Sequence, residues 1–280
     1  MTSPLTMRDL PAPWPDGCAG ALSLTFDDGT RSQLEIAIPM LNEFGLQATF
    51  YINPRGDDWM ARLAPWREAA RAGHEIGNHS LSHPCSRAFR DVRDGRGLED
   101  LTLEDIERDV LEAEQRLREA IPEQDERTFC YPCYQSHVGA GPRQQSYVPV
   151  IARHFIAARG KGEVANHPLT CDLHYLWSWP VERMWGAELV GLAERAASQG
   201  RWAILTFHGI HQGHLSVADV ALRELGACLA RARNRLWVAP VVTVARRILE
   251  WRRACGIEEA LPGRKEPRRD ATRPGPSASR

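Results

Sequence analysis

Residues 21–29 read Ala-Leu-Ser-Leu-Thr-Phe-Asp-Asp-Gly, a strand-like pattern that ends in two carboxylates. The apolar and β-prone residues predict a buried strand over 21–26. Aspartate and glycine are common in turns, so a turn alone would account for the last three residues. Two adjacent carboxylates at the end of a buried strand also repel each other, and such a pair favours a functional site in which the two groups have different roles.

Similar strand-like runs recur along the chain, usually with helical patterns between them. The runs lie at 21–26, 47–52, 74–77, 127–131, 155–158, 202–207 and 236–238. Thr102 to Asp105 looks like a capping box at the start of a helix, and Ser216 is expected to cap another. Strands separated by helices imply a parallel sheet, and this many units over about 220 residues favour an α/β barrel over an open sheet.

The composition argues against several classes of partner. The chain has 280 residues and a formal net charge of −1, which gives no electrostatic reason to expect a nucleic acid or an anionic membrane. No apolar run reaches the roughly 18 residues that a membrane span requires, so we predict none. The first residues contain no signal-peptide pattern, which favours a cytoplasmic protein. The oligomeric state stays open.

We expect three parts in the chain. Residues 1–20 contain four prolines and should form an N-terminal arm, residues 21–255 a single catalytic domain, and residues 256–280 a disordered basic tail. The seven cysteines are an odd number without the spacing of a disulfide scaffold. They are therefore expected to be free thiols in a reducing compartment.

Polar residues follow several of the predicted strands at the point where each strand ends. Asp27 and Asp28 follow the first strand, His79 and His83 follow the third, and His208 follows the sixth. In a parallel barrel the carboxyl ends of the strands share one face, where side chains from distant sequence positions converge. We therefore expect these five residues to form one site.

The spacing of His79 and His83 is i, i+4, which would place two imidazoles on one side of a helical turn, within reach of a metal ion. A carboxylate from Asp27 or Asp28 would complete a set of two histidines and one carboxylate with open positions for water and substrate. His208 ends an apolar strand on the same face and is a candidate general acid. A separate site of three histidines, made of His208, His211 and His214, is an alternative.

Three stretches together resemble the polysaccharide deacetylases that share the NodB homology domain, carbohydrate esterase family 4. They are Thr-Phe-Asp-Asp-Gly at 25–29, His-Ser-Leu-Ser-His at 79–83 and Leu-Thr-Phe-His-Gly at 205–209. The resemblance extends over about residues 21–245. It implies a deformed (β/α)7 barrel, similar to a TIM barrel, that binds one divalent metal ion and removes acetyl groups from acylated sugars. The metal would be zinc, with cobalt, nickel or manganese as alternatives.

The same resemblance implies a role for each site residue. Asp27 would be the catalytic base and His208 the general acid, while Asp28, His79 and His83 would be the metal ligands. Cys133 and Tyr134 lie in the family's third motif, which supplies oxyanion and substrate contacts. The implied reaction is hydrolysis of a carbon–nitrogen bond other than a peptide bond, in an N-acetylated carbohydrate or a related small amide, with an O-acetyl ester as the other option.

The third motif departs from the family pattern. It usually reads Arg-x-Pro-x-Gly, and here residues 130–134 read Cys-Tyr-Pro-Cys-Tyr. Cys130 therefore stands where an arginine would orient the base, and a neutral thiol cannot replace a guanidinium. Thr206 stands where leucine is usual. These changes leave open a divergent enzyme or a non-catalytic carbohydrate-binding module. The Cys-x-x-Cys spacing of Cys130 and Cys133 also permits a redox role.

Overall fold

Strand β1 (Gly20–Asp27) lies at the centre of the sheet, and all eight of its residues are buried. It runs parallel to β9 (Trp202–Phe207) on one side. On the other side it pairs with β10 (Leu236–Val238) near its beginning and with β2 (Thr49–Ile52) near its end. The computed structural model describes residues 10–89, 96–211, 213 and 215–257.

The sheet curls into a barrel of parallel strands. From β2 it continues through β3 (Glu75–Asn78), β4 (Phe129–Cys130) and β7 (Ala158–Arg159). Arg159 then forms a parallel bridge with Leu176, just before β8 (Trp179–Pro180), and β8 pairs with β9. The expected α/β barrel is confirmed. Its closing strand, however, is the segment 176–180, because residues 236–238 pair only with the beginning of β1.

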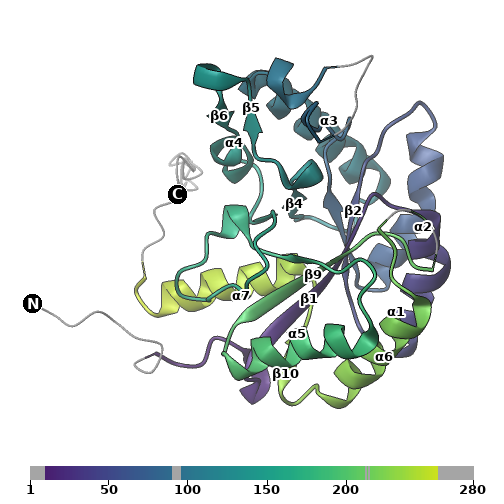
Figure 1. Ribbon diagram of the computed structural model, residues 1–280, viewed down its shortest axis with the longest axis vertical. Helices are drawn as coiled ribbons and strands as arrows, with labels where there is room; N and C mark the ends of the chain where they lie inside the picture. The colour runs from purple at the N-terminus through teal and green to yellow at the C-terminus, as the bar shows by residue number, and fades with distance from the viewer. Residues whose placement is uncertain (1–9, 90–95, 212, 214, 258–280) are drawn as a thin grey trace, which may run out of the picture.

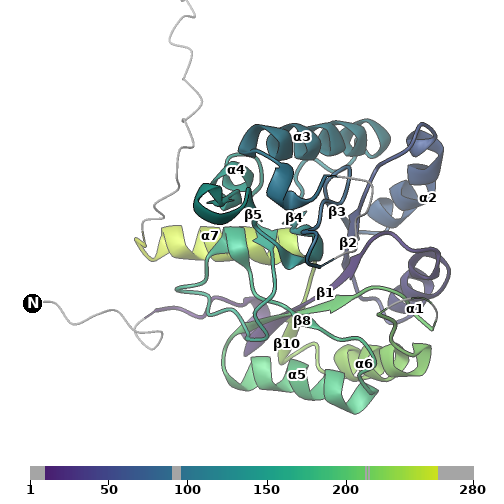
Figure 2. The same cartoon turned by 45° about the horizontal axis from the view of Figure 1, so that its top comes forward.

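Helices surround the barrel, as the two views of the ribbon show (Figures 1 and 2). They are η3 (Gln33–Ala37), α1 (Ile38–Glu43), α2 (Trp59–Arg71), α3 (Leu103–Ala120), α4 (Val148–Ala152), α5 (Gly186–Ser198), α6 (Asp219–Arg231) and α7 (Val241–Ala254). Short 3-10 turns are η2 (Pro15–Gly17), η4 (Leu98–Asp100), η5 (Pro132–Tyr134), η6 (Gly141–Arg143) and η7 (Leu173–Tyr175), and β5 (His137–Val138) pairs antiparallel with β6 (Gln145–Ser146).

Two predicted caps have different outcomes. Thr102 and Asp105 form the expected capping box at the start of α3. Ser216, by contrast, does not cap α6, because that helix begins at Asp219 with Ala218 as its N-cap residue. The carbonyl of Ser216 instead accepts a hydrogen bond from the Arg183 N–H.

Alternate residues of β1 face opposite sides of the sheet. Leu22, Leu24 and Phe26 belong to the apolar core beneath the surrounding helices. Ser23 and Thr25 are fully buried, and their hydroxyls donate to the carbonyls of Ala239 and Leu205. This alternation gives the barrel a polar interior, and Asp27 continues the inward-facing set at the carboxyl end of the strand.

The floor of this interior is a buried carboxylate. Glu75 accepts hydrogen bonds from the N–H and hydroxyl of Thr128, from the hydroxyl of Thr49 and from the N–H of Val242. Val242 lies in the first turn of α7, where a helix N-terminus favours an acceptor or a negative charge. Glu75 therefore ties α7 to the amino-terminal end of the barrel.

The ends of the chain are described only in part. Residues 11–13 of the expected arm contact α7, where Trp251 and Arg247 donate to the carbonyls of Pro11 and Pro13. Residues 1–9 and 258–280, which include almost all of the expected basic tail, lie outside the described residues. Among the helices that the structure describes, none is long and apolar enough to cross a membrane.

Candidate active site

The five predicted site residues lie at the carboxyl edge of the barrel. Asp27 is the last residue of β1 and Asp28 follows it, while His79 comes directly after β3 and His208 directly after β9. The strands are parallel, so these positions meet on one face. The five residues, which the sequence analysis assigned to one site, therefore lie together at this edge of the barrel.

Asp28, His79 and His83 form a three-residue cluster. The Oδ1 atom of Asp28 lies 3.5 Å from Nε2 of His79 and 3.3 Å from Nε2 of His83. One donor atom from each residue lies within 4.8 Å of the others. Two imidazole nitrogens and one carboxylate oxygen suit zinc and related divalent ions, and three protein ligands leave a coordination position open.

The segment 79–83 is not the helical turn that the spacing predicts. Ser80 and His83 both have positive φ angles, of 61° and 55°, so the chain forms an irregular loop. Side chains hold that loop in place: Asp109 of α3 accepts hydrogen bonds from the N–H groups of Leu81 and Ser82, and the Ser80 hydroxyl accepts from the His83 N–H. The two imidazoles meet because of these contacts and not because of helical periodicity.

A hydrogen bond from the Nδ1 atom fixes the orientation of the His79 ring. Nδ1 lies 2.9 Å from the carbonyl oxygen of Cys130 and donates a hydrogen bond to it. Nε2 then faces Asp28 with its lone pair, which is the arrangement found for histidine ligands of metals. Asp28 itself is kept ionised: burial would raise its pKa, but its interactions with the neighbouring His79 and His83 imidazoles lower it below its ordinary value.

Asp27 is paired with an arginine that the sequence analysis did not assign to the site. Nη2 of Arg159 lies 2.5 Å from both carboxylate oxygens of Asp27, and both side chains are buried. Burial alone would raise the pKa of Asp27, but the charges of Arg159, His79 and His208 outweigh it and hold this pKa below its ordinary value. Asp27 is therefore a carboxylate at neutral pH.

The position of Arg159 explains two departures from the family pattern. Its Nη2 atom contacts Sγ of Cys130 at 2.6 Å, and Nη1 donates to the hydroxyl of Thr206 at 2.9 Å. A small residue at 130 leaves room for the guanidinium, and the hydroxyl at 206 accepts a hydrogen bond from it. The charge missing at Cys130 on β4 is thus supplied from β7, the neighbouring strand. Arg159 directly follows the predicted strand 155–158, so the rule that located the other site residues would also have identified it.

His208 lies beside the same carboxylate, with Nε2 3.9 Å from Oδ2 of Asp27. His211, only three residues later, is exposed and faces Asp219, with Nδ1 3.5 Å from the carboxylate. His208 and His211 thus face different acids. The third member of the alternative three-histidine site, His214, lies outside the described residues.

Cys133 is not a free thiol, because it forms a disulfide with Cys85. The expectation of seven free thiols is therefore wrong, and so is the redox pairing of Cys130 with Cys133. Burial raises the pKa of the Cys130 thiol, which is unsuited to a reactive thiolate. Residues 85 and 133 are far apart in the sequence, and no spacing pattern indicates that the fold brings them together.

Tyr134 takes the place of the motif's usual glycine. Its φ angle is 59°, in the left-handed region that favours glycine, and Cys133 has a φ angle of 54°. The hydroxyl of Tyr175 donates to the Tyr134 carbonyl, which helps to hold this turn. The Tyr134 hydroxyl is buried and has no hydrogen-bond partner among the residues that the structure describes.

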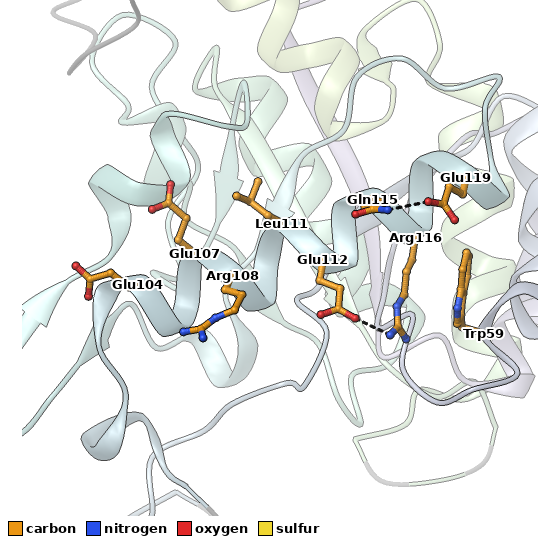
Figure 3. A pocket seen from close by; sticks show the side chains of 9 residues that line it. All are labelled: Trp59, Glu104, Glu107, Arg108, Leu111, Glu112, Gln115, Arg116 and Glu119. Carbon is orange, nitrogen blue, oxygen red and sulfur yellow. Dashed lines mark hydrogen bonds and ion pairs between the residues drawn. The ribbon is translucent and has the colours of Figure 1, made fainter.

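Two of the hollows outside the cluster lie beside the third motif and along α3. One, of about 330 Å³, is bordered by Tyr134, Gln135 and Tyr175 and is therefore next to the third motif. The other, of about 670 Å³, runs along the outer face of α3, where Trp59 lies beside Arg116 (Figure 3). Its side chains form local pairs such as Arg116 with Glu112, and none of the five site residues borders it.

Comparisons with known proteins agree with this geometry. Residues 16–138 match the model of the polysaccharide deacetylase family. A chitooligosaccharide deacetylase of Sinorhizobium fredii is 34% identical over 115 residues, which cover 41% of this chain and 47% of that protein. The match thus spans about half the length of this curated relative.

Solved structures share the fold at low sequence identity. A protein from Mycobacterium smegmatis described as a polysaccharide deacetylase has a TM-score of 0.62 at 18% identity, over 92% of this chain and 98% of that one. The carbohydrate esterase domain of a xylanase from a Trinervitermes trinervoides hindgut metagenome has a TM-score of 0.50 at 15% identity, over 85% and 91%.

Fold and cluster together define a (β/α)7 barrel of the NodB type with histidine and aspartate at its carboxyl edge. Over the matched segment the chain resembles the polysaccharide deacetylase family, as its motifs predicted.

Proposed function

We propose that this protein is a metal-dependent hydrolase that removes an acetyl group from an acetylated carbohydrate or a related small amide. The observation that carries the proposal is the Asp28, His79 and His83 cluster beside the buried pair of Asp27 and Arg159. The substrate class rests on the family, and the Sinorhizobium relative is a chitooligosaccharide deacetylase.

Asp28, His79 and His83 would hold the cation, because their donor set fits zinc, cobalt, nickel or manganese. When bound, a divalent ion at this site supplies a Lewis acid for an acyl carbonyl and makes water more acidic. The hydrogen bond from His79 to the Cys130 carbonyl keeps that imidazole in the tautomer a ligand needs.

Asp27 would act as the base. It is ionised and oriented by Arg159, so it is ready to take a proton from the attacking water. His208, next to Asp27 and only partly buried, would give a proton to the departing amine or alkoxide. The two groups lie side by side on the same face of the barrel, where a base and an acid could act on the same bond.

The third motif would contact the acyl group. The Tyr134 N–H donates to the Tyr131 carbonyl within the turn, so the backbone N–H of Cys133 is the better candidate for stabilising an oxyanion. Tyr134 would contribute through its buried, unpartnered hydroxyl instead. Removing one such donor typically costs 10²–10³ in rate, so this contact would be worth roughly that much.

The alternative of a non-catalytic carbohydrate-binding module rested mainly on the absence of an arginine at position 130. Arg159 makes the contact to the base that such an arginine would make, so this reason no longer favours the module.

Metal analysis combined with acetate release tests the proposal. Wild-type protein loaded with zinc should release acetate from N-acetylated chitooligosaccharides or from an O-acetylated glycan. Asp27→Asn and His208→Asn should keep the metal and lose activity by about 10²-fold or more. His79→Ala and His83→Ala should lose the metal, and the exposed His211→Ala is the matched control.

Bound metal with no acetate released from any acylated substrate would favour the binding module. Full metal occupancy in both ligand variants would contradict the assigned ligands. Because Asp27→Asn leaves Arg159 without its partner, its unfolding curve should be recorded as well, so that lost activity is not confused with lost folding.

A further inference from the structure

The disulfide Cys85–Cys133 lies beside the candidate metal cluster and joins two of its loops. Cys85 is two residues after His83, and Cys133 belongs to the third-motif turn. The bridge spans 48 residues of sequence and crosses from the loop after β3 to the loop after β4. Breaking this bond would therefore affect both loops.

His83 has a different group at each of its two nitrogens. Nε2 faces Asp28 at 3.3 Å, whereas Nδ1 lies 3.7 Å from Sγ of Cys85. The ligand atoms that His83, Cys85 and Cys133 can offer lie within 4.8 Å of one another. One imidazole nitrogen and two sulfurs are ligand types that zinc prefers, and the three residues already lie close together.

We propose that reduction of the Cys85–Cys133 disulfide creates a second metal site, made of the two thiolates and Nδ1 of His83, for zinc or a similar thiophilic divalent cation. Thiolate and imidazole ligands select such metals, whereas the Asp28, His79 and His83 cluster contains no sulfur. His83 belongs to both ligand sets, so the two sites share one imidazole.

The chemistry is a simple exchange followed by binding. A dithiol reductant supplies two electrons and two protons; the bond between the two sulfurs breaks, two thiols form, and the reductant becomes its own disulfide. Binding of a divalent cation then releases the two thiol protons to solvent, together with the N–H proton of His83 when the first site is also occupied. The cation would hold together the same two loops that the covalent bond joins in the oxidised protein.

The backbone conformation of the third-motif turn depends on contacts that hold the two loops together. Cys133 and Tyr134 have consecutive left-handed conformations, which are unfavourable for residues other than glycine. Such conformations persist only where surrounding contacts hold them. A cation bound to Cys85 and Cys133 would replace the bridge as one of those contacts.

Cobalt binding to the full-length, metal-free protein tests the proposal without any activity measurement. The protein is titrated with Co²⁺ as purified, and again after treatment with a dithiol that is removed under anaerobic conditions. We expect a thiolate-to-cobalt charge-transfer absorption and one additional equivalent of Co²⁺ only after reduction. Cys85→Ser and Cys133→Ser should abolish the absorption, and Cys255→Ser, a partly exposed free thiol, should keep it.

A second measurement uses wild-type protein alone, in case the serine variants do not fold. Alkylation followed by peptide mass spectrometry should modify Cys85 and Cys133 only after reduction, and the alkylated protein should lose the absorption. Reduced thiols with no cobalt absorption would overturn the proposal, as would alkylation of both cysteines before reduction. If the oxidised protein binds no Co²⁺, the proposed hydrolase site fails, while the absorption after reduction still decides for or against the second site.

Discussion

At the scale of single residues, the buried pair of Arg159 and Asp27 distinguishes this protein from the usual pattern of the family that it resembles. The guanidinium approaches from β7, contacts both carboxylate oxygens and stacks near the rings of Tyr51 and Tyr134. A buried pair of this kind is costly to break, because removing one partner leaves the other charged and desolvated. The pair therefore affects both the stability of the protein and the ionisation of the proposed base.

Arg159→Gln should destabilise the protein by about 3–5 kcal/mol, since it leaves the Asp27 carboxylate buried without its cation. It should also raise the pKa of Asp27, which Arg159 now lowers. The acid limb of kcat/KM would then move to higher pH, because the base must be ionised to act. Urea unfolding and pH–rate profiles check the two effects.

Arg153→Gln is the matched control, because Arg153 forms a half-exposed pair with Glu107 and neither residue belongs to the site. A variant of Arg159 with reduced stability and an unchanged acid limb would show that the arginine is structural only. A shifted limb in the Arg153 variant would mean that the shift does not come from the buried pair.

Much of the candidate site could be predicted from residue types and their positions. Asp27, His79 and His208 lie at the carboxyl ends of buried strands. The parallel arrangement brings such positions together regardless of the conformation of the loops. Arg159 obeys the same rule and was missed because no motif contains it. The pairing of Cys85 with Cys133 could not be predicted, since it depends on how two irregular loops approach each other.

At the scale of elements, the loop 79–83 depends on a neighbouring helix for its shape. Asp109 of α3 accepts from two consecutive backbone N–H groups of this loop. The loop contains two residues with positive φ angles, so it has little intrinsic preference for its conformation. The position of His83 therefore rests on a carboxylate that is not itself a ligand.

Asp109→Ala should weaken metal binding by roughly tenfold or more, as losses of supporting contacts around metal ligands commonly do. Asp109→Asn should have a smaller effect, because an amide oxygen can still accept one hydrogen bond. Zinc titration against a competing chelator measures the change. Glu104→Ala, an exposed position on the same helix, should leave the affinity unchanged, and an equal loss there would contradict the role of Asp109.

Prediction from sequence was weaker for elements than for residues. Six of the predicted strands form the barrel, and each contains apolar residues between helical segments. The remaining strand of the barrel, β8, was not predicted: it is short and ends in proline, so neither its length nor its pattern separates it from a loop. The predicted strand 236–238 exists but pairs only near the beginning of β1.

At the scale of the whole molecule, stability should depend on pH through His74, which lies at the amino-terminal end of the barrel. Its Nδ1 accepts from the Ala48 N–H and its Nε2 contacts Asn42. Burial lowers the pKa of His74 from 6.5 to about 4. The folded protein therefore takes up this proton only at lower pH than the unfolded chain does.

The contribution of His74 is complete above about pH 6.5 and is lost as the pH falls from there to about 4, because the unfolded chain binds the proton first. The loss should reach about 3 kcal/mol over this range. His74→Gln should flatten that part of the curve of unfolding free energy against pH. The exposed His137→Gln is the control, and an unchanged slope in the His74 variant would contradict the prediction.

The closure of the barrel between β7 and Leu176 has a consequence for local opening. Only short segments meet there, through hydrogen bonds such as Gly160 N–H to the Leu176 carbonyl and Leu176 N–H to the Ala158 carbonyl. Segments with few hydrogen bonds open more readily than long central strands. Arg159 lies at this seam, so each transient opening would release the base from its cation, and amide exchange at Leu176 would report how often the site is incomplete.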